Sequence, residues 1–422
     1  MIFSKITKEI SLIIIPWLCV AIMRLFGPIS FKELSEKFII FIIAFGVVNV
    51  IGYLIGRFVR VRSLRAKKVH FVQLKDRNSG NFFIFLVALV YIALMVMDFF
   101  LNKGGTLTTI TEVRESDNIT GGRMSIIGGI MALTSAAPYI LLCMTSYSRQ
   151  NGSALRSNLP FVVAMLGIAI GFLSGGRNSF LIGIIVFGFQ SLYMRRYNNQ
   201  PKIINDKRFG LRIVLAASIL FSFYIFLERE TQQGASIRDV LSIFSFKWNV
   251  TVANLSADST LIQGIYAIMV MAIFYATHAL TYIDQYFTQD VSPLLFGAYN
   301  FPIMAKIIDF IYGGGVFTGV ANSLIVAGVY ITLPGSLYMD FGYIGAIVFG
   351  LILSILTGHL NNSKVVTSFR RMQLLSVLSA IWILSPIYSV FAMANGFSYI
   401  FLLIVLSIIT KIRINMFVKK KK

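Results

Sequence analysis

Apolar runs long enough to cross a lipid bilayer recur along almost the whole chain, and they constrain its fold more than any other feature. The runs are about 17–23 residues long, the length that a helix needs to cross roughly 30 Å of hydrocarbon. Lipid cannot hydrogen-bond exposed backbone amides, so such segments must be helical. Charged residues make up only 13% of the chain, against about a quarter in soluble domains. The sequence therefore predicts an all-α polytopic membrane protein, with one integral membrane domain over residues 1–422.

The apolar runs predict about ten transmembrane helices, with eleven or twelve as alternatives. We place them at 10–27, 38–56, 81–100, 124–146, 158–174, 179–194, 211–227, 338–357, 373–392 and 397–414. One large loop, 228–337, separates the seventh helix from the eighth. We expect re-entrant or interfacial helices in this loop. Loops of this length are usually functional. No small-residue cleavage site follows the first run, so we interpret it as an uncleaved helix.

Basic residues are concentrated on alternate connections between the predicted helices. The connections on one side hold 27 Lys and Arg and three acids, those on the other hold 10 and 14, and Arg24 is the remaining base. The positive-inside rule then places both termini in the cytoplasm and the loop 228–337 on the outer face. Topology therefore accounts for the net charge of +21, and we expect no nucleic-acid partner.

The run 262–279 inside this loop is apolar enough to span a bilayer. One extra helix would move the basic C-terminus to the outer face, so parity allows either none or two. A second span at 316–332 would make the stretch between them cytoplasmic, although that stretch carries three aspartates and a single lysine. We prefer a loop that stays on the outer face, and the alternative remains open.

Several arginines stand at helix ends on the predicted outer face, namely Arg114, Arg123, Arg177 and Arg229. A guanidinium is a planar fork that matches phosphate oxygens, so converging arginines would bind a diphosphate. Arg177 is the sharpest case, because it lies at the tip of a hairpin where two preceding glycines let backbone amides approach an anion. Each arginine could instead cap a helix or pair with a nearby acid. We expect Arg24 to snorkel to the interface.

Carboxylates and a single histidine on the outer face are candidates for general acid–base catalysis. We single out Glu230, His278 and Asp340, which could deprotonate an acceptor hydroxyl. The alternative for His278 is a hydrogen-bonded packing residue, and for Asp340 a cap at the N-terminal end of the eighth helix. The other carboxylates considered on this face are Glu228, Asp258 and Asp284. The sequence has no HExxH, paired-histidine, DxD or P-loop motif, so we expect no metal, no cofactor and no coupling to ATP.

Three local motifs stand out: the loop with Arg114 and Arg123, the hairpin S174-G-G-R-N-S-F180, and the helix start D340-F-G-Y-I-G345 after the large loop. In these motifs the chain resembles the Wzy-type O-antigen polymerases, also called oligosaccharide repeat unit polymerases. Asn322, shortly before that start, also fits the pattern. The resemblance implies a GT-C-like fold in the bacterial inner membrane, with no metal.

The same resemblance implies an activity and partners. A growing glycan would leave one undecaprenyl diphosphate and join a fresh lipid-linked repeat at the periplasmic face, for lipopolysaccharide O-antigen or a related surface polysaccharide. Arg114, Arg123, Arg177 and Arg229 would lie near the diphosphates. The implied partners are undecaprenyl-diphosphate-linked oligosaccharides, membrane lipid and a protein that regulates chain length.

Other functional classes stay open. A lipid-linked oligosaccharide flippase, or another transporter, is expected to have two similar halves and charges inside its spans. The dissimilar halves and nearly charge-free spans of this chain favour the polymerase. An O-antigen ligase or a cell-wall glycan polymerase would use the same donor from the same face, so layout does not exclude it. A structural membrane scaffold is the remaining alternative.

Overall fold

The computed structural model describes residues 2–58, 77–102, 126–150, 158–171, 177–198, 250–253, 260–312, 325, 330–361 and 369–419. The first half of the chain contains α1 (Ile2–Phe26), β1 (Ile29–Ser30), α2 (Glu36–Phe58), α3 (Arg77–Val96), the π-helix η1 (Met97–Asn102), α5 (Ile126–Thr134), α6 (Ala137–Gln150), α7 (Leu159–Gly171) and α8 (Arg177–Asn198). The second half contains β2 (Thr251–Val252), α11 (Thr260–Thr288), α12 (Pro302–Tyr312), α13 (Leu333–Leu360), α14 (Phe369–Leu384), the 3-10 helix η5 (Val390–Ala392) and α15 (Ala394–Lys419).

The described residues form a helical membrane protein, as the apolar runs predict. Nine of the ten predicted spans coincide with helices of the structure, and the tenth, 211–227, lies outside the described residues. Five described helices are long and apolar enough to cross a membrane, namely Glu36–Phe58, Phe82–Leu101, Ile127–Ser146, Ile262–Thr288 and Leu333–Leu360. Shorter apolar helices add to these. The all-α membrane class is confirmed, whereas the number of spans stays a prediction.

Two predicted boundaries are corrected by the structure. The eighth predicted helix, α13, begins at Leu333 rather than at 338, because Thr332 caps it by accepting a 3.1 Å hydrogen bond from the Gly335 backbone N–H. The ninth, α14, ends at Leu384 rather than at 392. Pro386 explains the early end, since the residue before a proline is disfavoured in the helical conformation.

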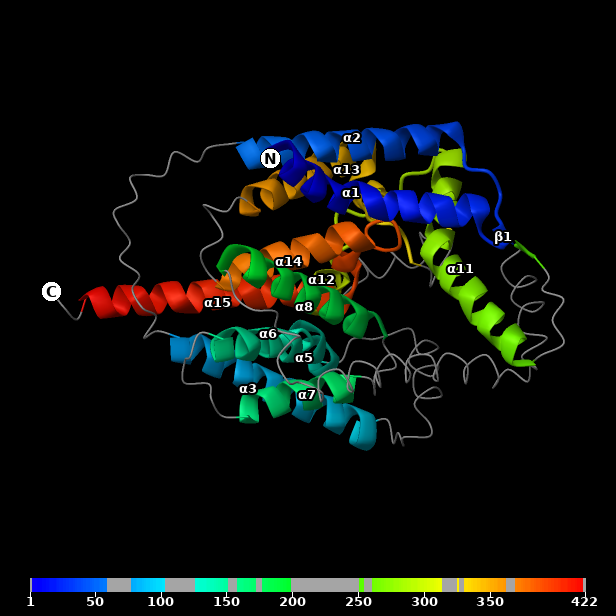
Figure 1. The fold of residues 1–422 in the computed structure, drawn as a ribbon. Helices are drawn as coiled ribbons and strands as arrows, with labels where there is room; N and C mark the ends of the chain where they lie inside the picture. The colour runs from blue at the N-terminus through cyan, green and yellow to red at the C-terminus, as the bar shows by residue number, and fades with distance from the viewer. Residues whose placement is uncertain are drawn as a thin grey trace.

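The long helices lie roughly side by side in layers, and one helix crosses their ends (Figure 1). α1, α2 and α13 form one side, α8, α14 and α15 the middle, and α3, α6 and α7 the other side. α1 begins and α15 ends at the same end of this bundle, and α11 lies across the opposite end. We call that opposite end the α11 end.

α2 and α13 run parallel and are packed closely through small residues. Gly52 of α2 faces Ser354 of α13, and Gly56 faces the backbone at Ile355. Gly358 of α13 likewise faces the backbone of α2. Because a larger side chain at any of these positions would overlap the partner helix, the seam depends on small residues, as in other membrane helix pairs.

α11 lies at the boundary of the bundle and contacts the ends of three helices. Its Thr281 accepts a hydrogen bond from Arg24 near the end of α1, and its Asp284 accepts one from Ser35, just before α2. Ile283 packs against Gly335 at the start of α13. By length and composition α11 is one of the helices that could cross a membrane. The prediction of an interfacial helix inside the loop 228–337 stays a prediction.

Candidate functional site

Several chain segments that are distant in sequence meet at the α11 end. α8 begins there with Arg177. Its first turn is joined to the start of α15, because the Ser179 carbonyl accepts a 2.9 Å hydrogen bond from Asn395 Nδ2. The backbone N–H of Leu333 donates to Ser385 O at 2.8 Å, which joins the start of α13 to the end of α14. The end of α1, the start of α2 and α11 complete this region (Figure 1).

Asp340 organises a buried turn at this end. Its carboxylate accepts hydrogen bonds from the backbone N–H groups of Tyr299 and Asn300, both at 3.0 Å, and from Asn300 Nδ2 at 2.7 Å. Asn300 Oδ1 in turn accepts from Ser336 Oγ at 2.9 Å and from Ser389 Oγ at 2.5 Å. Asp340 and Asn300 are fully buried. The carboxylate therefore fixes the turn between α11 and α12 to α13. Asn300 in turn joins this turn to Ser389, just before η5.

The position of Asp340 in its helix differs from the sequence prediction. α13 starts at Leu333, seven residues before Asp340, and is kinked at Gly342, where φ is +68°. Asp340 therefore precedes a kink instead of capping the first turn, and its carboxylate bonds to a neighbouring segment. Glycine suits this kink because it adopts positive φ without a steric penalty.

Tyr299, inside the same turn, is also buried. Burial raises the pKa of its phenol, and the nearby Tyr286 and Asp340 raise it further. Because a buried phenolate beside a carboxylate is disfavoured, this group stays protonated and takes no part as a base.

His278 lies in an aromatic cluster on α11. Its ring is 1% exposed and stacks on Phe274, with ring centroids 4.8 Å apart. The edges of Tyr275, Tyr282 and Tyr330 surround it. Nδ1 lies 2.9 Å from the Phe274 carbonyl oxygen, which can only accept, so Nδ1 carries the proton and Nε2 of a neutral ring is left as an acceptor. The packing role predicted as the alternative for His278 is observed, and in this tautomer Nε2 carries no proton.

Arg24 turns toward α11, and its predicted snorkelling to the interface stays a prediction. Its Nη1 donates to Thr281 Oγ1 at 2.8 Å and its Nη2 donates to the Lys32 carbonyl oxygen at 2.6 Å. The guanidinium carbon lies 4.7 Å from the centre of the Phe31 ring. Asp284 attracts Arg24 electrostatically, although its carboxylate is hydrogen-bonded to the backbone N–H and hydroxyl of Ser35.

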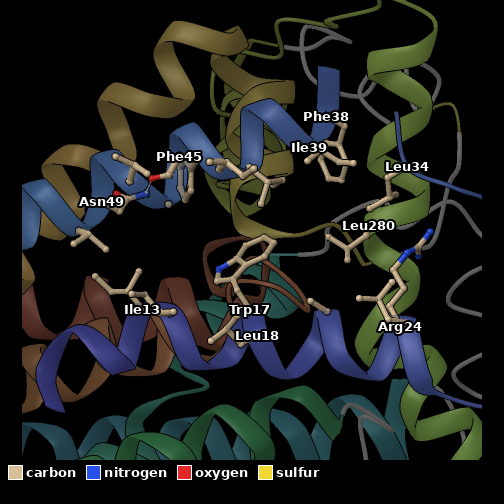
Figure 2. A pocket seen from close by; sticks show the side chains of 18 of the residues that line it. Ile13, Trp17, Leu18, Arg24, Leu34, Phe38, Ile39, Phe45, Asn49 and Leu280 are labelled. Atoms are coloured by element: carbon tan, nitrogen blue, oxygen red, sulfur yellow. Dashed lines mark hydrogen bonds between the residues drawn. The ribbon is translucent and has the colours of Figure 1, made fainter. Parts of the chain in front are cut away.

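An apolar groove opens between α1 and α2 and ends at Arg24. It has a volume of about 1070 Å³, and Trp17 and Trp382 contribute to its lining. Figure 2 shows Arg24 beside Leu280 of α11 at one end of the groove, and Ile13 and Asn49 toward the other. Lys32 and Glu33 also line it, and both are exposed.

The structure describes only part of the predicted site. Arg114, Arg123, Arg229, Glu230 and the family-pattern residue Asn322 lie outside the described residues, as do Glu228 and Asp258. For Arg177 the backbone position at the start of α8 is described, and the side chain is not. His278 and Asp340 are brought to the same end of the bundle as Arg177. Within the described residues, no group of three or more His, Cys, Asp or Glu could hold a metal ion.

Sequence reasoning missed the groove and the orientation of Arg24. A basic residue in the last turn of an apolar helix, followed closely by Lys32, was the available signal. That pattern is equally typical of an interfacial anchor, so only the contact with α11 distinguishes the two roles.

Comparison with known proteins assigns no relative to this chain. No protein-family model, no curated protein and no solved structure matches its sequence or fold.

Proposed function

We propose that this protein is an inner-membrane glycosyltransferase that joins undecaprenyl-diphosphate-linked oligosaccharide repeats at the periplasmic face, as an O-antigen or related polysaccharide polymerase. The observation that carries the proposal is that Arg24, the backbone of Arg177 at the start of α8, His278, Asp284 and Asp340 come from distant segments and all lie at the α11 end. A transfer reaction on a membrane lipid needs cations, an acceptor of protons and a rigid frame at one membrane surface.

The proposed reaction has a simple balance. An acceptor sugar hydroxyl of a fresh lipid-linked repeat attacks the anomeric carbon of the growing glycan, and the bond from that carbon to the donor diphosphate breaks. The hydroxyl proton passes to a base, and the electron pair leaves with the diphosphate. Arg114, Arg123, Arg177 and Arg229 would hold the diphosphates and stabilise the departing charge.

The remaining candidate residues have two roles in this proposal. His278 and Glu230 are the candidate bases. Nε2 of His278 keeps its acceptor lone pair, and Glu230 lies outside the described residues. Asp340 is a positioning residue in this proposal, since its carboxylate accepts the hydrogen bonds that hold the turn at Tyr299 and Asn300. The D340-F-G-Y-I-G345 motif of the resemblance would then supply the frame of the site, with the chemistry carried by other residues.

A flippase or other transporter is supported less well. An ion pair between Lys37 and Asp290 joins α2 to the residues after α11 and lies at the bundle end. Transporters instead place ionisable groups near the bilayer midplane. An O-antigen ligase or a cell-wall glycan polymerase would use the same kind of site, and only the reaction product separates these from the repeat polymerase.

Deletion of the gene tests the reaction class. Electrophoresis of extracted lipopolysaccharide should then show a single repeat unit in place of a ladder of long chains. Complete loss of surface repeats would favour a flippase or a ligase, and an unchanged ladder would contradict the proposal.

Substitution of Arg177 tests its role. Arg177→Ala should abolish polymer while the protein level and the single-repeat glycan stay normal, because the guanidinium would hold the diphosphate. Arg177→Lys should also be poor, since a point charge does not replace a bidentate fork. Normal long chains in Arg177→Ala, measured on the same gels, would remove Arg177 from the site.

A further inference from the structure

We propose that the groove between α1 and α2 binds the hydrocarbon tail of a polyprenyl diphosphate, with its diphosphate at Arg24. The inference deepens and rests on the proposed function, because it says where one lipid-linked substrate sits. It assigns a binding site to residues that the sequence resemblance does not include.

The lining of the groove is suited to a lipid tail. It is made almost wholly of aliphatic and aromatic side chains from α1 and α2, including Ile13, Leu18, Ile39, Ile43 and Val47. Four of these are between 43% and 60% exposed, namely Leu18, Ile39, Ile43 and Val47. The groove is therefore open at its side, so a lipid could enter from the bilayer. Its volume of about 1070 Å³ lies at the upper limit of ordinary small-molecule pockets.

The length of the groove corresponds to one leaflet. Ile13 and Arg24 both line it and are eleven positions apart on α1, which gives about 16 Å at 1.5 Å per residue. Half of a hydrocarbon core of roughly 30 Å is about the same distance. A lipid whose headgroup lies at Arg24 would thus place the first part of its tail along the groove within a single leaflet.

The charges at the mouth identify the headgroup. Arg24 is half-buried, and the described residues contain no carboxylate within ion-pair distance of it. Its contacts with Thr281 and the Lys32 carbonyl use two of its five N–H groups, so donors remain for an anion. Lys32 lines the same mouth, together with Glu33. Asp284 also attracts Arg24, but its carboxylate is hydrogen-bonded to Ser35. The remaining N–H groups of Arg24, together with Lys32 at the end of an apolar groove, complement a phosphate on a long hydrocarbon chain.

Gly46 provides a direct way to close the groove. It lines the groove, and a Cβ atom built on it meets nothing within 4 Å. Gly46→Phe should therefore fill the space without displacing a neighbour. Gly188 on α8 is a matched control, because its Cβ also meets nothing within 4 Å and it lies outside the groove.

The test measures binding of undecaprenyl diphosphate to the purified full-length protein by native mass spectrometry. Gly46→Phe should weaken binding by at least about tenfold, or about 1.4 kcal/mol, while Gly188→Phe binds like the wild type. Arg24→Gln should also weaken binding, and phosphatidylglycerol at equal concentration should not compete. Wild-type binding by Gly46→Phe overturns the proposal, and equal competition by phosphatidylglycerol overturns it in favour of an ordinary phospholipid site.

The outcomes separate this inference from the proposed function. If deletion leaves the glycan ladder unchanged while Gly46→Phe loses the lipid, the groove stands as a polyprenyl site and the polymerase proposal falls. If deletion gives the single-repeat phenotype while Gly46→Phe binds normally, the polymerase stands and the tail binds elsewhere.

Discussion

The two faces of α2 meet their neighbours in opposite ways. Toward α13, Gly52 and Gly56 let the two backbones approach so closely that an added Cβ would overlap Ser354 or the Ile355 carbonyl. Toward α1, the same helix leaves a groove, and a Cβ on Gly46 meets nothing. Glycine therefore allows close helix packing on one face of α2 and leaves space for a groove on the other. Its structural effect depends on which element lies opposite.

The connection between α1 and α2 accounts for the open face. Gly27 packs on Ile273 of α11, strand β1 pairs with β2, and Ser35 is held by Asp284. The chain between the two helices is thus fixed to other elements, and Leu280 of α11 lies in the mouth between them (Figure 2). The α2–α13 seam has no such insertion, and close packing of small residues is what stabilises it.

Substitution in the closed seam should have the largest effect. Gly56→Leu would force a side chain against the α13 backbone, and we expect it to cost more than about 3 kcal/mol, above the usual range for overpacking. The measurement is the thermal unfolding midpoint in detergent, or loss of the monodisperse peak on size exclusion. Gly46→Leu is the matched control on the same helix, expected to change stability by less than about 1 kcal/mol, with leucine the better helix former. Equal damage from both substitutions would contradict the comparison.

Asp340 holds the Tyr299–Asn300 turn at the α11 end, and its loss should have the second largest effect on stability. Asp340→Ala would leave Asn300 Nδ2 and the Tyr299 and Asn300 amides without their acceptor, which should cost about 2–3 kcal/mol. Asp340→Asn keeps one acceptor oxygen and should lose roughly half as much. The same unfolding assay checks both variants. A wild-type midpoint for Asp340→Ala would mean that the turn is held by its other contacts.

The helices could be predicted from the length and charge of the apolar runs. The site could not, because it depends on side-chain contacts that no local pattern encodes. The run 38–56 predicts α2 well because a membrane span needs a fixed length of apolar residues. Gly350 of α13 allows close helix packing, since it faces Phe45 and Asn49 of α2. Gly342 instead permits the kink, and Gly345 faces Phe341 of its own helix. The sequence could not distinguish these three glycines, because the difference lies in the partner.

The position of His278 could be predicted, and the position of Arg24 could not. His278 is one turn from Phe274 and near Tyr275 and Tyr282 in sequence, so an aromatic helix face already indicates packing. The partner of Arg24, Thr281, is 257 residues away along the chain. A contact of that separation follows from the packing of α11 across the bundle and has no local signal.

Trp17 of α1, which lines the groove, should contribute moderately to the free energy of unfolding. Its Nε1 donates to Ser385 Oγ at 3.0 Å and ties α1 to the end of α14 beneath the groove. Trp17→Phe should lose about 1 kcal/mol, the usual net value of one hydrogen bond. A double-mutant cycle with Ser385→Ala sharpens this, since the double variant should lose less than the sum of the single losses. Additive losses would show that the hydrogen bond does not join the two helices energetically.

The ion pair between Lys37 and Asp290 should have the smallest effect on stability. Lys37 Nζ lies 2.8 Å from Asp290, but the side chains are 65% and 74% exposed, so solvent screens the pair and Lys37→Met should cost less than about 0.5 kcal/mol. Asp290→Ala should cost more, although both variants remove the same pair. The reason is backbone conformation: Asp290 has φ of +51°, which aspartate and asparagine tolerate better than alanine. Asp290→Asn should therefore match Lys37→Met in the unfolding midpoint, and equal losses for all three variants would show that the left-handed turn carries no strain.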